Sequence, residues 1–213
     1  MNLIFDGPTD GPVFLFTHGA GAPLNSNFME AVTQGLASKG IRVIRFNFPY
    51  MQQRVDTGTR RPPERAPKLI AQLASVIKSI DQPMVIGGKS MGGRMATLIA
   101  SESWEVNHHI KAIACLGFPF HPAAKPQQLR TAHFPLIKQP VLIIQGDRDK
   151  LGSRPEVESY QLPSSIKWHW LADGDHDFKP RVKSGFNQQQ HIASAIDALA
   201  EFIFISHENS LTT

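Results

Sequence analysis

The chain has 213 residues, of which 41% are hydrophobic and 19% are charged, and its formal net charge is +4 at pH 7. These values are ordinary for a globular domain and exclude a disordered or low-complexity chain. A chain of this length is sufficient for one sizeable core, so the expected organisation is a single domain over residues 1–213.

The charge distribution and the termini argue against several classes of partner. The densest positive charge lies in residues 54–65, RVDTGTRRPPER, without the basic helix face or interleaved aromatics of a nucleic-acid site. We interpret this segment as a solvated loop, with contact to an anionic substrate as the alternative. Residues 1–6 lack the basic start of a signal peptide, and no apolar stretch is long enough to span a membrane. The sequence therefore predicts no nucleic-acid partner and no membrane partner.

The single cysteine bears on the redox compartment. Cys115 lies in the apolar run 112–116, where a buried structural thiol is expected rather than a nucleophile. With no second cysteine, no internal disulfide can form. A reducing, cytoplasmic setting is the favoured hypothesis.

Apolar runs rich in β-branched and aromatic residues alternate along the chain with helical patterns. The predicted strands are 13–17, 41–46, 84–87, 110–116, 141–145 and 166–171, and the predicted helices are 28–38, 66–80, 91–101 and 188–205. Turn residues separate 2–5 from the first of these strands, which indicates a short antiparallel edge. The alternation predicts a parallel sheet covered on both faces. Between Phe118 and Pro140 five prolines occur, so this segment is expected to be loop without a lid domain.

The motif G-K-S-M-G at residues 88–92 contains the first candidate catalytic residue, Ser90. It follows a predicted strand and precedes a predicted helix, which is the context of a nucleophile elbow. Side chains crowd both sides of the serine in this sharp turn, so only residues without a Cβ atom, glycines, fit beside it. The N-terminus of the helix that follows favours the negative charge that develops during acyl transfer. A phosphate-binding loop would need glycine where the chain has Pro83. A structural serine in a tight turn stays open as an alternative.

The partners of such a serine follow it in the chain as an acid and then a histidine. The strand 141–145 is followed by Gly146 and by two carboxylates, Asp147 and Asp149. Asp149 is favoured because the turn needs a few residues before a side chain can point back over the sheet edge, and Asp147 is the alternative. His176 lies on the loop after the next strand and is the candidate base. A metal site at 175–177 lacks further ligands at suitable spacing.

The loop H-G-A-G at residues 18–21 follows the first parallel strand. In this position the N–H of Ala20 is expected to form one half of an oxyanion hole, and the N–H of Met91, after the serine, the other half. The same loop is similar to the start of a dinucleotide-binding motif. That interpretation fails because Leu24 occupies the place of the third small residue and no acid follows the second strand. No cofactor and no metal are therefore expected.

Taken in order, these blocks resemble the α/β-hydrolases, in particular the compact type related to dienelactone hydrolases and small bacterial esterases. The matching blocks are 18–21, 46–50, 88–94, 116–120, 145–149 and 174–176. The segment G-F-P-F-H-P at 117–122 is further similar to a little-characterised subgroup of predicted hydrolases. One departure is Ser90, which stands where dienelactone hydrolases have cysteine, so a lactone substrate is not implied. The resemblance implies a mostly parallel central sheet with helices on both faces, a reduced N-terminal edge and no separate lid domain.

The expected activity is hydrolysis of an ester, thioester or related acyl bond in a small-molecule substrate. In this scheme His176 takes the proton of Ser90, Asp149 orients the imidazole, and the N–H groups of Ala20 and Met91 hold the oxyanion. Two alternatives keep the same fold. One is a non-catalytic binding or scaffolding protein, and the other is perhydrolase or haloperoxidase chemistry.

Overall fold

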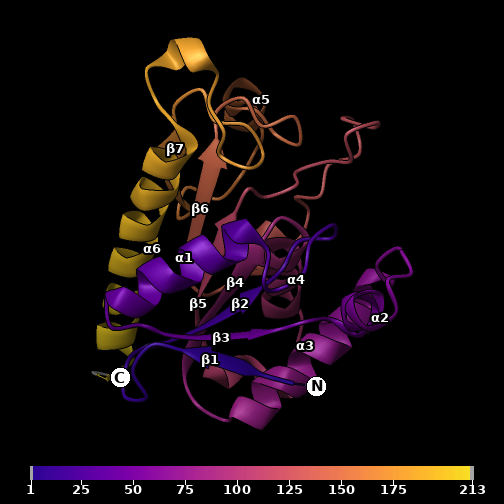
Figure 1. The fold of residues 1–213 in the computed structure, drawn as a ribbon, viewed down its shortest axis with the longest axis vertical. Coiled ribbons are helices and arrows are strands. Elements are labelled where there is room, and N and C mark those ends of the chain that lie inside the picture. The colour runs from indigo at the N-terminus through magenta and orange to yellow at the C-terminus, as the bar shows by residue number, and fades with distance from the viewer. Residues whose placement is uncertain (1, 212–213) are drawn as a thin grey trace.

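The computed structural model describes residues 2–211, which form one seven-stranded sheet flanked by helices (Figure 1). The strand order is β1-β3-β2-β4-β5-β6-β7. The strands are β1 (Ile4–Asp6), β2 (Val13–Thr17), β3 (Arg42–Phe46), β4 (Met84–Lys89), β5 (Ile110–Leu116), β6 (Val141–Gly146) and β7 (Lys167–Leu171). Strand β1 runs antiparallel to β3, whereas every other neighbouring pair is parallel. The mostly parallel sheet and its short antiparallel edge are confirmed.

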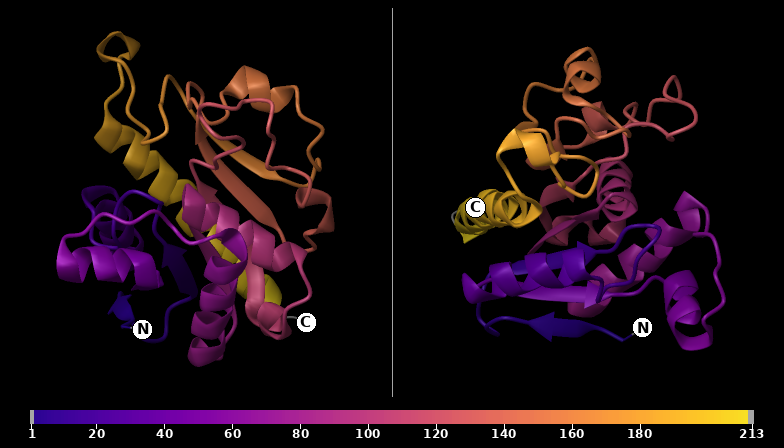
Figure 2. Two further views of the ribbon diagram at one scale, coloured as in Figure 1. Left: turned by 90° about the vertical axis from the view of Figure 1, so that its right-hand side faces the viewer. Right: turned by 45° about the horizontal axis from the view of Figure 1, so that its top comes forward.

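The helices cover both faces of this sheet (Figures 1 and 2). They are α1 (Asn27–Ser38), α2 (Pro49–Thr57), α3 (Ala66–Ile80), α4 (Met91–Ser101), α5 (Arg154–Glu158) and α6 (Gln188–Leu211). Helices α1 and α6 pack on one face, and α3 and α4 on the other. Two hydrophobic clusters result, one on each side, which explains why the central strands are buried along their whole length.

Helix α3 shows how the sequence selects this arrangement. Its buried positions include Leu69, Leu73, Val76 and Ile77, which recur at intervals of three and four residues and form one apolar stripe. The helix ends at Ile80, and the next residue, Asp81, has the left-handed φ of 51° that is common just after a helix. The predicted range 66–80 is confirmed at both ends.

Two helices were not predicted. Helix α2 begins with Pro49 and has only two buried residues, Tyr50 and Met51, so its sequence shows no apolar stripe. Part of the segment interpreted as a solvated loop, Arg54 to Thr57, is thus the last turn of α2. Helix α5 has five residues and is fixed by a capping box between Ser153 and Glu156. The C-terminal helix also continues to Leu211, beyond the predicted end at residue 205.

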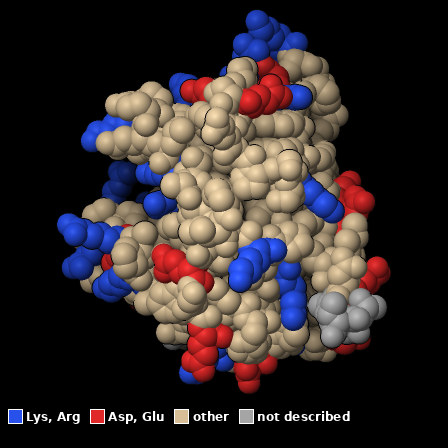
Figure 3. Space-filling model, turned by 180° about the vertical axis from the view of Figure 1, so that it is seen from behind, with Lys and Arg blue, Asp and Glu red and all other residues tan. Residues whose placement is uncertain are grey.

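The segment after β5 runs over the carboxyl ends of the strands without forming a lid. Between Gly117 and Pro140 the structure has one regular element, the three-residue 3-10 helix Phe134–Leu136. Seen from behind, the molecule is hollowed at the left edge, on the side where α2 lies, and Lys and Arg side chains gather around this recess (Figure 3). Within residues 2–211 no helix is long and apolar enough to cross a membrane.

Candidate active site

Three of the predicted site residues meet at the carboxyl edge of the sheet. Ser90 follows β4, Asp149 lies three residues after β6, and His176 lies on the loop after β7. The Nε2 atom of His176 is 2.9 Å from the Oγ atom of Ser90, and its Nδ1 atom is 2.7 Å from Oδ2 of Asp149. Parallel neighbouring strands end at the same edge, which is why residues up to 86 positions apart form one hydrogen-bonded chain.

The backbone at Ser90 is strained. Its φ of 51° and ψ of −111° lie outside the regions that a residue with a side chain favours. The strand turns directly into α4 here, and the Ser90 N–H is held by the Leu116 carbonyl at 2.9 Å. A Cβ atom at Gly88 or Gly92 would collide with Thr17 of the neighbouring strand, so both positions require glycine. The turn thereby fixes the Ser90 hydroxyl at the sheet edge.

The structure brings Asp149, and not Asp147, to His176. Asp149 is fully buried, and its Oδ2 accepts a second hydrogen bond from Gln145 Nε2 at 2.9 Å. Its Oδ1 accepts the Leu151 N–H at 2.8 Å. Asp147 makes no side-chain hydrogen bond among the described residues, and its Oδ1 is buried without a partner. Three donors therefore hold the Asp149 carboxylate in a fixed orientation, and Gln145 is a supporting residue that the sequence did not identify.

The two predicted oxyanion donors lie beside Ser90. Ala20 and Met91 line the same cavity as the serine, and in residues 2–211 neither N–H has a protein acceptor. Met91 is the first residue of α4, where the N–H groups have no intrahelical partner and carry the positive end of the helix dipole. The Tyr50 hydroxyl donates to the Ala20 carbonyl at 3.2 Å, which ties this loop to α2. The arrangement leaves two backbone donors available next to the hydroxyl.

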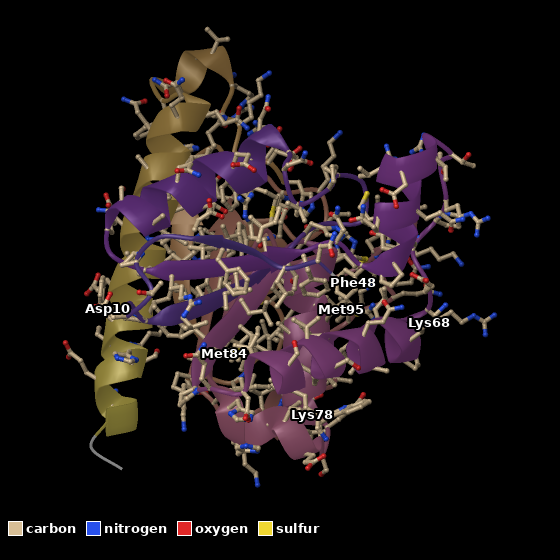
Figure 4. All side chains as sticks on the ribbon, turned by 60° about the horizontal axis from the view of Figure 1, so that its bottom comes forward. Asp10, Phe48, Lys68, Lys78, Met84 and Met95 are labelled. Atoms are coloured by element: carbon tan, nitrogen blue, oxygen red, sulfur yellow. The ribbon has the colours of Figure 1, made fainter. Side chains whose placement is uncertain are left out.

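The side chain of His18 holds the loop that contains Ala20 through hydrogen bonds. Its ring is buried, with Nδ1 2.7 Å from the Gly19 carbonyl and Nε2 accepting the Phe48 N–H at 3.1 Å. These partners require a neutral ring that donates from Nδ1. Burial accordingly lowers the pKa of His18 to about 4. Phe48 and Met95 both lie in the buried interior, whereas Lys68 and Lys78 lie on the outer surface of α3 (Figure 4).

This neutral histidine predicts an acid-sensitive fold. An unfolded His18 titrates near its ordinary pKa of 6.5, so between pH 6.5 and 4 the unfolded chain binds a proton that the folded chain excludes. The free energy of unfolding should therefore fall as the pH falls through this range, by roughly 3 kcal/mol from His18. The free energy of unfolding is measured by urea unfolding at a series of pH values. In His18→Asn the loss over the same range should be smaller by this amount, and equal losses in both proteins would contradict the assignment.

Lys89 is a residue of the site that the motif alone does not reveal. It occupies the variable position before Ser90, is buried, and donates from Nζ to the His176 carbonyl at 2.8 Å. Its Nζ also lies 3.2 Å from Asp177 Oδ1 and 5.4 Å from the centre of the Phe28 ring. Burial lowers the pKa of Lys89, and the Asp177 carboxylate opposes this shift. A lysine at the end of an otherwise buried strand is the one sequence signal that could have identified it.

Two cavities meet at Ser90. One has a volume of about 450 Å³ and extends over α4 toward the segment after β5. The other, of about 300 Å³, is lined by His176, Lys89 and Phe28. A substrate whose scissile bond lies over the Ser90 hydroxyl could therefore extend into both cavities.

The single cysteine, Cys115, is fully buried beneath α4, and burial raises the pKa of its thiol.

Comparison with known proteins identifies the family of this chain. A family model described as an alpha/beta hydrolase domain matches residues 10–204. The chain belongs to the α/β-hydrolase family. The fold of this α/β hydrolase is similar to that of Est1E from Butyrivibrio proteoclasticus, with a TM-score of 0.69 at 16% identity over 97% of this chain and 94% of that one.

Two further solved structures are similar in fold to this α/β hydrolase. Dienelactone hydrolase from Anabaena variabilis has a TM-score of 0.68 at 19% identity, over 95% of this chain and 91% of that one. The thioesterase domain from the curacin biosynthetic pathway has a TM-score of 0.63 at 18% identity, over 95% and 94%. The predicted resemblance to the α/β-hydrolases is thus confirmed, the similarity to dienelactone hydrolase is one of fold, and family membership supports hydrolase activity.

Proposed function

We propose that this α/β hydrolase is a serine hydrolase that cleaves an ester, thioester or related acyl bond, with residues 1–213 acting as one domain. The observation that carries the proposal is the hydrogen-bonded chain from Ser90 through His176 to the buried carboxylate of Asp149. A serine hydroxyl is a weak nucleophile by itself, and a base within hydrogen-bond distance activates it. The esterase and thioesterase names among the structures similar in fold are compatible with this reaction class.

The proposed reaction has two halves. In the first, His176 Nε2 takes the proton of Ser90 as Oγ bonds to the substrate carbonyl carbon, and the same proton then passes to the leaving group as its bond breaks. In the second, His176 takes a proton from water as the water oxygen bonds to the acyl carbon, and it returns this proton to Ser90 Oγ as the Oγ–acyl bond breaks and the acid is released. Asp149 stabilises the imidazolium, and the N–H groups of Ala20 and Met91 donate to the oxyanion of each tetrahedral intermediate.

The two cavities are proposed to hold different parts of the substrate. Because His176 must reach the leaving group to protonate it, the cavity that His176 lines accommodates the alcohol or thiol. The larger cavity, on the side of Met91 and α4, then accommodates the acyl chain. A panel of short 4-nitrophenyl esters and acyl thioesters tests the proposal, with Ser90→Ala as the control. Saturable turnover by the wild type alone supports it, and no turnover of any member would contradict it.

The open cleft predicts ordinary saturation kinetics with dissolved substrates. With no lid element between Gly117 and Pro140, no closure has to be relieved at an oil-water interface. Rates with short-chain esters should follow a hyperbola below the solubility limit of the ester. A steep rise only above that limit would instead show that this segment moves as a lid.

Lys89 is proposed as a positioning residue, because it holds the backbone of His176 rather than the reacting atoms. Lys89→Met should lower kcat by about tenfold to a hundredfold with little change in KM, since a shift of the base by about 1 Å is costly. Lys78→Met, at an exposed position on α3, is the control. The two variants are compared by ester kinetics, with circular dichroism to check folding. An unchanged kcat in folded Lys89→Met would remove the positioning role.

A further inference from the structure

The larger cavity beside Ser90 contains an excess of positive charge that the reaction scheme does not use. Four ionisable side chains line it: Glu64, Arg94, His121 and Arg130. Arg94 lies on α4 four residues after Ser90, so the two share one face of the helix, and helical side chains lean toward the N-terminus. Arg130 enters from the segment after β5, where its N–H is fixed by the Phe120 carbonyl at 2.7 Å.

Neither guanidinium is neutralised by the protein. Within the described part of the chain, Arg94 and Arg130 form no ion pair and no side-chain hydrogen bond. The Nε atom of Arg94 is buried without a partner, which is costly for a charged donor. Elsewhere in this fold a buried arginine is paired: Arg45 contacts both Asp6 and Glu30. The two arginines of this cavity, in contrast, have no carboxylate within ion-pair distance among the described residues.

The charges of the two arginines act on each other and on a third group. Arg94 and Arg130 line the same cavity, and burial, together with the Arg130 charge, lowers the pKa of Arg94. Burial and the Arg94 charge together lower the pKa of His133 to about 4, so His133 stays neutral. The one carboxylate that lines the cavity, Glu64, is 3.2 Å from Lys68 Nζ and within ion-pair distance of neither arginine. A cavity arranged in this way attracts an anion.

We infer that this cavity binds an anionic group on the acyl part of the substrate, through the guanidinium groups of Arg94 and Arg130. This inference rests on the proposed function, which places the acyl chain in the larger cavity. Guanidinium forks match the oxygen geometry of a carboxylate or a phosphate, and such bonds are strongest where water is excluded. The preferred substrates are thus acyl esters or thioesters with a negative charge several atoms from the scissile carbonyl, such as monoesters of dicarboxylic acids.

Two matched esters test the inference. The mono-4-nitrophenyl ester of adipic acid and the 4-nitrophenyl ester of hexanoic acid share a six-carbon acyl chain and differ by one terminal carboxylate. The uncatalysed rates are subtracted, and kcat/KM for the adipate monoester is divided by kcat/KM for the hexanoate ester. This ratio should fall by about tenfold or more in Arg130→Met and in Arg94→Met. Arg130→Met, in a loop, keeps the test valid if Arg94→Met does not fold. Arg60→Met removes an exposed charge outside the cavity and should leave the ratio unchanged.

A binding measurement on Ser90→Ala identifies the anion and does not depend on turnover. Adipate, inorganic phosphate and the neutral adipamide are compared by their effect on Tm, with and without Arg130→Met. Stabilisation by adipate that Arg130→Met abolishes indicates a carboxylate, and the same pattern for phosphate indicates a phosphorylated substrate. Failure of the wild type to hydrolyse the hexanoate ester counts against the proposed function alone. A kcat/KM ratio that is unchanged in both arginine variants, with neither anion stabilising the protein, overturns the inference.

Discussion

Ser90→Ala should abolish covalent labelling by a fluorophosphonate while the protein stays folded. Such a probe reacts with a serine hydroxyl that a neighbouring base activates, and His176 Nε2 lies 2.9 Å from Ser90 Oγ. Replacing one hydroxyl by hydrogen at a position whose backbone already accommodates a Cβ creates no clash. Labelling is measured by mass spectrometry of the intact protein, which should gain one adduct in the wild type and none in the variant.

Two controls make this result specific. Ser101→Ala, at the last position of α4, removes a hydroxyl that donates to the Leu98 carbonyl and should leave labelling unchanged. His176→Ala should slow labelling strongly, because Ser90 then has no base. Undiminished labelling in Ser90→Ala would assign the nucleophile to another residue and would remove the basis of the proposed mechanism.

Asp149→Asn should lower kcat by up to roughly ten-thousand-fold, as the triad template implies. The amide cannot stabilise an imidazolium, and at Oδ2 it would face both His176 Nδ1 and the Gln145 amide, which favours the wrong tautomer of His176. Asp147→Asn should have a much smaller effect, since Asp147 does not contact His176. Measuring kcat for ester hydrolysis in both folded variants shows which aspartate is the acid. If Asp147→Asn is the more damaging change, the acid is Asp147, and equally small effects would argue against a triad.

Much of the fold could be predicted from the sequence because its signals are local. Strands such as β5 and helices such as α3 have a clear period and turn residues at their ends, so their ranges agree with the structure. Helix α2 lacks an apolar stripe, and its position depends on contacts such as that of Tyr50 with the distant Ala20. No local pattern records such a contact.

The same distinction applies to the site. Ser90, Asp149 and His176 were identifiable because each follows a strand in the order that parallel strands impose. Lys89 contacts a carbonyl 87 positions away, and Gln145 contacts Asp149, four positions away. Both residues occupy positions that motifs leave variable. Arg94 and Arg130 likewise come to line one cavity only when the segment after β5 folds over α4.

The contact between Lys89 and the histidine loop has a consequence for the way this site can change through mutation. Lys89 precedes the nucleophile, whereas its counter-charge, Asp177, follows the base, and the two are joined by a 3.2 Å ion pair. Losing Asp177 alone would remove the carboxylate that is paired with this buried ammonium group, which destabilises the folded protein. A chimera that takes its histidine loop from another hydrolase should therefore fold well only if residue 89 comes from the same parent. The two segments are expected to be inherited together.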